Sequence, residues 1–119
     1  MGKAPEESEP RVMVGLYDLA VWFMKHTNRF PKNWRVTLGD RIDNTLVDML
    51  CLVHRARVRS DKLDLLHRAN EELDILRMLS RLCLEMGCLE GRQREYVARQ
   101  IDEIGRQIGS WIRHLKMKQ

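Results

Sequence analysis

A repeat of large apolar residues near the C-terminus constrains the fold more than any other feature of this 119-residue sequence. Between positions 97 and 115 these residues recur at alternating spacings of four and three, the pattern of a helix with one narrow buried seam. The seam consists of Val97, Ile101, Ile104, Ile108, Trp111 and Leu115. We therefore expect this segment to be a helix that packs against other helices.

Local signals mark the ends of three further helices. Pro10 fits the first turn of a helix, where its missing N–H costs nothing. Thr37-x-x-Asp40 resembles a capping box, and Gly87 is a natural left-handed cap after a helix C-terminus. We expect helices at about 10–27, 37–58, 61–87 and 92–116. Residues 1–9 are polar and rich in glutamate, and we expect this acidic tail to be disordered.

These segments predict an all-α fold. A chain of this length has room for one domain, here residues 10–119. No segment shows the sustained period-two alternation of a half-buried strand. Four amphipathic helices with short connections favour an antiparallel up-down-up-down four-helix bundle.

The first predicted helix is apolar on every side. From Val12 to Met24, 11 of 13 residues are apolar or aromatic, but a helix that spans a bilayer needs ~20 such residues. The surplus apolar face predicts a subunit interface between copies of the chain. Alternatively, long loops or the N-terminal tail cover this face. The residues proposed for the interface are Met13, Tyr17, Trp22 and Met24.

Positive charge gathers in separate segments of a chain whose formal net charge is +4. An antiparallel bundle places the connection between the second and third helices beside the C-terminus, with the loop at 28–36 at the opposite end. Both ends are then cationic and could bind the phosphates of nucleic acid. Alternatively, the cations only complement helix dipoles. The candidate cations are Arg29, Lys32, Arg35 and Arg41 at one end, and Arg55, Arg57, Arg59, Lys62, Arg113, Lys116 and Lys118 at the other.

Two aromatic residues are interleaved with the cations of the 28–36 loop. Phe30 and Trp34 could stack on unpaired bases while the neighbouring cations contact phosphates. More often such residues close the open end of a bundle core. We favour the second interpretation, because Trp and Phe side chains are costly to leave in water.

Catalytic and metal-binding motifs are missing from the sequence. It has no Glu-x-x-His pair of the di-iron type, no His-Glu-x-x-His, no Gly-x-Ser-x-Gly and no Walker loop. Cys51, Cys83 and Cys88 follow neither a disulfide framework nor a zinc spacing, and no apolar leader precedes them. We expect a non-enzymatic cytoplasmic protein without a cofactor, a metal or a membrane segment.

One stretch of the sequence resembles a known family. Trp22, Arg29-Phe30-Pro31-Lys32, Arg35 and Leu38-Gly39-Asp40-Arg41-Ile42 are similar to the accessory variability determinant (Avd) family of diversity-generating retroelements. The resemblance continues through Ala69, Leu73, Leu76-Arg77, Arg81-Leu82 and Gly109-Ser110-Trp111, and covers about residues 12–115. A sister group, the four-helix proteins encoded in 23S ribosomal RNA intervening sequences, shares the Phe-Pro element. That group usually continues with an Asn-Ile-Ala-Glu-Gly stretch, where this chain has Val53-His54-Arg55-Ala56.

The resemblance to the Avd family implies a four-helix bundle that assembles into a basic homopentameric barrel. It also implies a non-enzymatic accessory protein that binds the retroelement reverse transcriptase and its template RNA during mutagenic copying. The family supplies no catalytic residues. The alternative is a structural or protein-interaction bundle of the intervening-sequence type, without a role in nucleic-acid binding.

Overall fold

The computed structural model describes residues 5–119, with the backbone alone for residues 5–10. Four long helices dominate it: α1 (Pro5–Thr27), α3 (Asp40–Val58), α4 (Lys62–Glu85) and α5 (Gly91–Met117). A short helix α2 (Lys32–Trp34) and a π-helix η1 (Arg35–Gly39) lie between α1 and α3. The described residues contain no strand, so the predicted all-helical class is confirmed.

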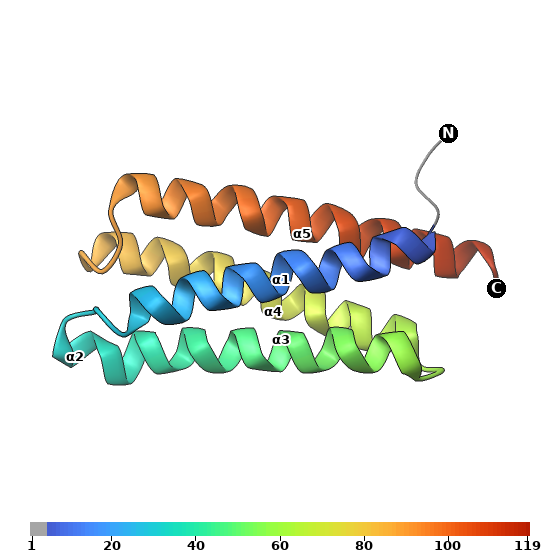
Figure 1. The fold of residues 1–119 in the computed structure, drawn as a ribbon, viewed down its shortest axis with the longest axis horizontal. Coiled ribbons are helices and arrows are strands. Elements are labelled where there is room, and N and C mark those ends of the chain that lie inside the picture. Colours follow the sequence, from blue (N-terminus) through green and yellow to red (C-terminus); the bar gives the residue numbers. More distant parts are fainter. Residues whose placement is uncertain (1–4) are drawn as a thin grey trace.

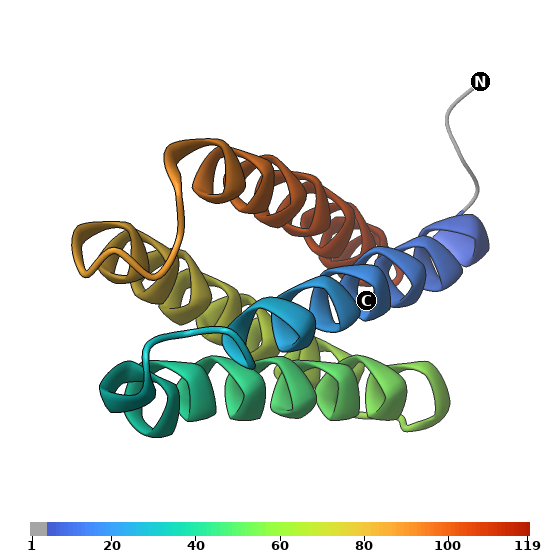
Figure 2. The same ribbon diagram turned by 60° about the vertical axis from the view of Figure 1, so that its left-hand side comes forward.

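Each long helix packs against two of the other three. α1 contacts α3 and α5, and α4 contacts the same two helices, so α1 and α4 occupy diagonal corners (Figure 2). The connections at 28–39 and 86–90 lie at one end of the molecule, which we call the loop end (Figure 1). The connection at 59–61 and the C-terminal residues lie at the other, which we call the terminal end. The longest dimension of the molecule is 48 Å, so the loop end and the terminal end are separate surfaces.

The predicted seam of α5 lines the core. Val97, Ile101, Ile104, Ile108 and Trp111 are buried, and Leu115 at the end of the helix is half-buried. They pack in one apolar cluster with residues of the other three long helices, among them Phe23, Leu46 and Leu73. The narrow seam is thus the surface through which α5, one of the four long helices, packs into the shared core.

The end of α4 is the expected left-handed cap. Gly87 has a φ of 77°, a conformation that favours glycine. The backbone N–H of Cys88 donates to the carbonyl of Cys83 at 2.8 Å, and that of Gly87 donates to Leu84 at 3.1 Å. These two bonds define a Schellman motif, which satisfies carbonyls at the end of the helix and reverses the chain.

The helical backbone begins earlier than we expected before α3. Trp34 and Arg35 both donate their backbone N–H to the carbonyl of Pro31, at 2.9 Å, so a helical turn starts directly after the proline. Thr37 is therefore not an N-cap; its Oγ1 donates to the carbonyls of Asn33 and Trp34 within the turn. The π-helix, which holds more residues per turn than an α-helix, joins α2 directly to α3, so the backbone is helical without a break from Lys32 to Val58.

The first helix also starts earlier, at Pro5 instead of near residue 10. Residues 5–9 of the expected tail are therefore helical in the structure, in keeping with the good helix propensity of glutamate. Residues 1–4 of that tail lie outside the described part of the chain.

Candidate nucleic-acid interface

The terminal end brings together segments that are distant in the sequence. Residues 60–64 line a shallow groove with Leu115 and Gln119, so the connection between α3 and α4 lies against the end of α5. This places Arg59 and Lys62 in the same neighbourhood as Lys116 and Lys118. The terminal end therefore gathers cations from three helices, together with the carboxylates of Asp61 and Asp64 that line the groove.

Two of these cations are occupied by contacts within the chain. The Nζ of Lys62 donates to the carbonyl of Ala56 at 2.7 Å, which completes the C-terminal turn of α3. Arg59 pairs with Asp61 across 3.0 Å. A charge held in such contacts is less available to a phosphate, so Lys62 and Arg59 are the weakest candidates at this end.

The other terminal-end candidates have no such partners. Within residues 11–119, none of them forms an ion pair with a carboxylate, and all of them are exposed. Exposed cations without carboxylates can exchange their counterions for phosphates. This set consists of Arg57, Arg113, Lys116 and Lys118. Arg55 is also exposed and forms no ion pair, but it lines a groove with Asp48, Glu71 and Glu72.

The loop end is more mixed in charge. Arg29, Lys32 and Arg35 are exposed, but Arg35 lines a groove together with Asp40. Arg41 lies in a second groove that also contains Asp48 and Glu72 from α3 and α4. Neighbouring carboxylates lower the local positive potential, so this end is less suited to phosphates than the terminal end.

The two aromatic residues of the 28–39 connection pack against the core. Phe30 is only 5% exposed, and Trp34 is half-buried against the same apolar cluster. A base could reach the ring of Phe30 only if the end of the bundle opened. The packing supports the interpretation that these rings close the core.

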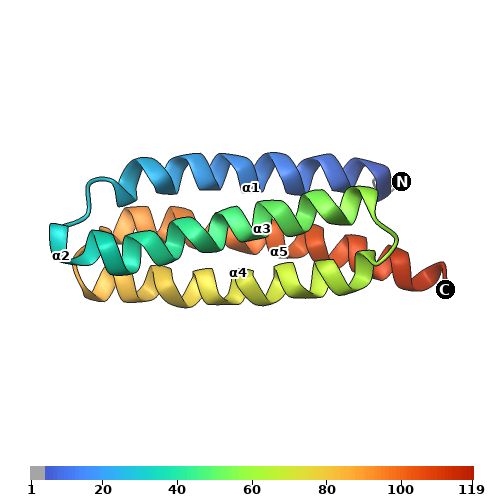
Figure 3. The same cartoon turned by 90° about the horizontal axis from the view of Figure 1, so that it is seen from below.

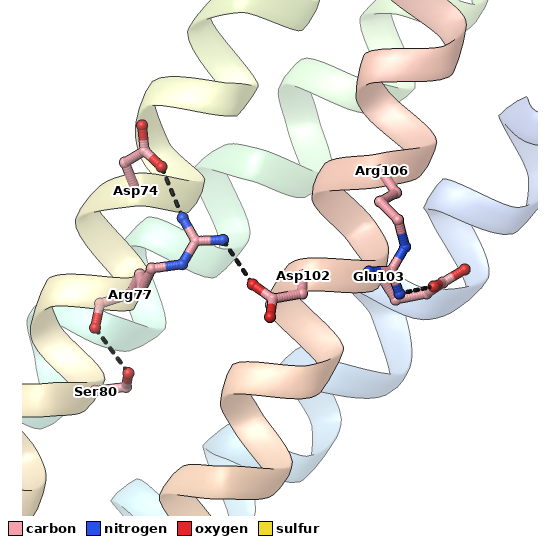
Figure 4. A network of polar contacts seen from close by, with 6 residues as sticks. All are labelled: Asp74, Arg77, Ser80, Asp102, Glu103 and Arg106. Carbon is pink, nitrogen blue, oxygen red and sulfur yellow. Dashed lines mark hydrogen bonds and ion pairs between the residues drawn. The ribbon is translucent and has the colours of Figure 1, made fainter.

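The side of the bundle formed by α4 and α5 is balanced in charge (Figure 4). Arg77 bridges the two helices, with Nη1 2.8 Å from Asp74 and Nη2 3.1 Å from Asp102. On the side of α5 away from α4, the guanidinium of Arg106 pairs with Glu103, and this hydrogen bond lowers the pKa of the Glu103 carboxyl (Figure 4). Arg77 and Arg106 are thus both neutralised by carboxylates within the chain.

The residues proposed for a subunit interface divide into two groups. Tyr17 is 59% exposed, whereas Met13 and Met24 are half-buried and Met13 packs against the core cluster. Trp22 instead faces α5, because its ring stacks on His26 with centroids 3.7 Å apart and lies 5.1 Å from that of Tyr96. Trp22 therefore belongs to the fold and is not placed on the open face.

Two exposed valines extend the open face of α1. Val14 is 60% exposed and Val21 is 39% exposed, at helical spacing from Tyr17. With Met24 they form an apolar strip, which we call the α1 stripe: Val14, Tyr17, Val21 and Met24. Sequence periodicity shows that this helix is apolar all round, but it does not show which side the neighbouring helices leave uncovered.

A second apolar strip lies on α4 and was not predicted. Ile75 is 39% exposed, Met78 59%, Leu82 42% and Met86, which caps the helix, 39%. We call these four residues the α4 stripe. Their spacings of three, four and four are a helical signal, but it is hidden in the sequence by the core positions Leu76, Leu79 and Cys83 that alternate with them.

The described residues were also searched for a reactive thiol and for groups of metal ligands. Burial raises the pKa of the Cys83 thiol to about 12, so it stays protonated and is a poor nucleophile. Among residues 5–119, no three His, Cys, Asp or Glu side chains are grouped as the ligands of a metal ion would be. No helix in the same range has the length and apolar character needed to cross a membrane.

Comparisons with known proteins give the family. A search of curated proteins found no match to the chain. The model of the family described as bAvd-like matches residues 12–115, which comprise nearly all of the four helices. With this match and its four-helix architecture, the chain belongs to the bAvd-like family.

Proposed function

We propose that this protein is a non-enzymatic, cytoplasmic accessory subunit of a diversity-generating retroelement, in which it binds the reverse transcriptase and its template RNA. Family membership supports the accessory role. The observation that carries the RNA-binding part is the cluster of exposed cations without carboxylate partners at the terminal end: Arg57, Arg113, Lys116 and Lys118.

The proposed mechanism depends on assembly. One subunit offers a few cationic contacts, which are weak at physiological salt. A ring of subunits, which we propose to be a pentamer, would present the same terminal end several times on one face. The α1 stripe supports such assembly, because it exposes apolar surface that a monomer would leave in water. Multivalent contact then raises the effective affinity for a long RNA without any new kind of interaction.

Binding of a structured RNA, measured by fluorescence anisotropy from about 50 to 200 mM salt, tests this proposal. Each phosphate contact should contribute about 0.7–0.9 to the slope of log affinity against log salt. Arg113→Glu should weaken binding and lower this slope. Arg99→Glu makes the same charge change at an exposed position in the middle of α5 and should have a smaller effect.

The outcomes separate the two candidate functions. Equal losses in the two variants would mean that only net charge matters and that the terminal end is not the contact surface. Absence of binding at every salt concentration would overturn the RNA-binding part. It would leave a protein-interaction bundle, for which the two exposed apolar stripes provide the surfaces. Co-purification with a retroelement reverse transcriptase then tests the polymerase contact independently.

A further inference from the structure

The α4 stripe is an apolar surface that neither the fold nor the terminal-end contacts use. We propose that it receives the α1 stripe of a second copy of this chain, so that the subunit contact is heterologous. This inference rests on the self-association in the proposed function, and it identifies the two surfaces that meet.

The two stripes flank α3 from opposite sides (Figure 3). Val21 and Met24 line a groove with Val36 and Asp43 on the α1 side of α3. Ile75 lines the grooves between α3 and α4. Leu82 follows Ile75 by two helical turns and therefore lies on the same side of α4. The stripes thus occupy neighbouring faces of the four-sided bundle and do not lie back to back.

The stripes also match in length and in height along the bundle. From Val14 to Met24 the α1 stripe extends about 15 Å, and from Ile75 to Met86 the α4 stripe extends about 17 Å. Met24 and Met86 lie at the ends of their helices that face the loop end (Figure 1). Two copies with parallel long axes can therefore place the stripes against each other along their whole length.

One pair of charges beside the stripes is complementary at the loop end. Lys25 follows Met24 on α1 and is exposed, in a groove that also holds Arg35, Asp40 and Asp43. On the other stripe, Glu85 is exposed and lies next to Met86 and one turn from Leu82. With parallel axes Lys25 and Glu85 meet at the rim of the contact, which favours this pairing over contact of the α1 stripe with itself.

The consequence of two different contact surfaces is a chain of subunits instead of a symmetric pair. Because the stripes occupy neighbouring faces, each contact turns the direction of the next one, and the chain closes into a ring. Two faces back to back would have extended it into a filament. Met78 and Met86 can adapt their unbranched side chains to the rings and branched side chains of the α1 stripe.

Two variants, each of which damages one stripe, test the pairing. Tyr17→Asp and Met78→Asp change equally exposed side chains, at 59% each, so that neither should unfold the subunit. Ser110→Asp, at an exposed position of α5, is the matched control. Mass should be measured by light scattering after size-exclusion chromatography, with circular dichroism as the check of folding.

The expected result has three parts. The wild-type chain and Ser110→Asp form the same oligomer, and each stripe variant alone is a monomer. An equal mixture of the two stripe variants forms a dimer and nothing larger, because one intact α1 stripe and one intact α4 stripe remain. A Met78→Asp variant that assembles like the wild type would overturn the heterologous contact but leave self-association standing. A wild-type monomer would instead contradict the self-association itself.

A charge exchange gives a second measurement. Lys25→Glu and Glu85→Lys should each weaken the oligomer, and the two changes together in one chain should restore it. Failure of the double variant to recover any assembly, when both single variants are impaired, would contradict the parallel arrangement of the subunits.

Discussion

A hydrogen bond between side chains ties α1 to α3 near the loop end. The Oγ1 of Thr27 donates to the Oδ1 of Asp43 at 2.9 Å. Burial nevertheless raises the pKa of the Asp43 carboxyl, and the bond from Thr27 offsets this only in part; the charge on Asp40 raises the pKa further. Asp43 is therefore a carboxyl group that folding makes harder to ionise.

This shift predicts how stability depends on pH. A carboxyl whose pKa is raised by folding contributes stability below its unfolded pKa, and this contribution is lost as pH rises through the folded pKa. Asp43→Asn keeps an acceptor for Thr27 but cannot ionise. The melting temperature of Asp43→Asn should therefore gain on that of the wild type as pH rises from the acid range towards neutral. A difference that stays constant with pH would show that Asp43 ionises like an exposed carboxyl.

Sequence patterns identified the apolar residues of each helix, but they did not show which of these residues a neighbouring helix covers. The seam of α5 was predicted correctly because its spacing alone fixes one face. Trp22 and Leu82 were harder, since both belong to helices with apolar residues on more than one side. Whether such a residue is covered depends on which neighbouring helix lies there, and a single sequence does not contain that information.

The sequence predicted the end of a helix where a single nearby residue determines it. The cap at Gly87 depends on one residue whose conformation favours glycine, and it lies where the sequence indicated. The start of α3 depends instead on the carbonyl of Pro31 and on an extra residue in η1. A π-turn has no simple spacing signature, so the capping-box pattern at Thr37 led to a later start than the structure shows.

The packing of the 28–39 connection predicts the effect of removing Trp34. Full truncation of a buried Trp costs about 3–5 kcal/mol, so Trp34→Ala, at a half-buried position, should lower the free energy of unfolding by about 1–3 kcal/mol. Val36→Ala, at a 65% exposed position in the same connection, should stay within about 0.5 kcal/mol of the wild type. Urea denaturation measures both. RNA affinity at a temperature where all variants are folded should not change, whereas its loss with unchanged stability would favour base stacking.

At the scale of the whole molecule, the two kinds of surface are separate. The apolar stripes flank α3 towards the loop end, and the unpaired cations lie at the terminal end. The expected topology of the sequence predicted cations at both ends. Which carboxylates lie beside these cations depends on how α3 and α4 pack, and the sequence alone does not give that packing. A subunit built this way can assemble through its sides and keep one end of the bundle free.

Separate surfaces predict that assembly and RNA binding can be uncoupled by one substitution. Tyr17→Asp leaves every terminal-end cation in place and removes the contact between copies. If multivalency supplies the affinity, this variant should bind a structured RNA at least about tenfold more weakly than the wild type, with a smaller salt slope, because fewer cations reach one RNA together. The control Asn33→Asp carries the same added charge at an exposed position of the opposite end and should bind like the wild type. Equal affinity of Tyr17→Asp and the wild type, with the variant shown to be monomeric, would mean that each subunit binds RNA alone. The ring would then serve the polymerase and not the template.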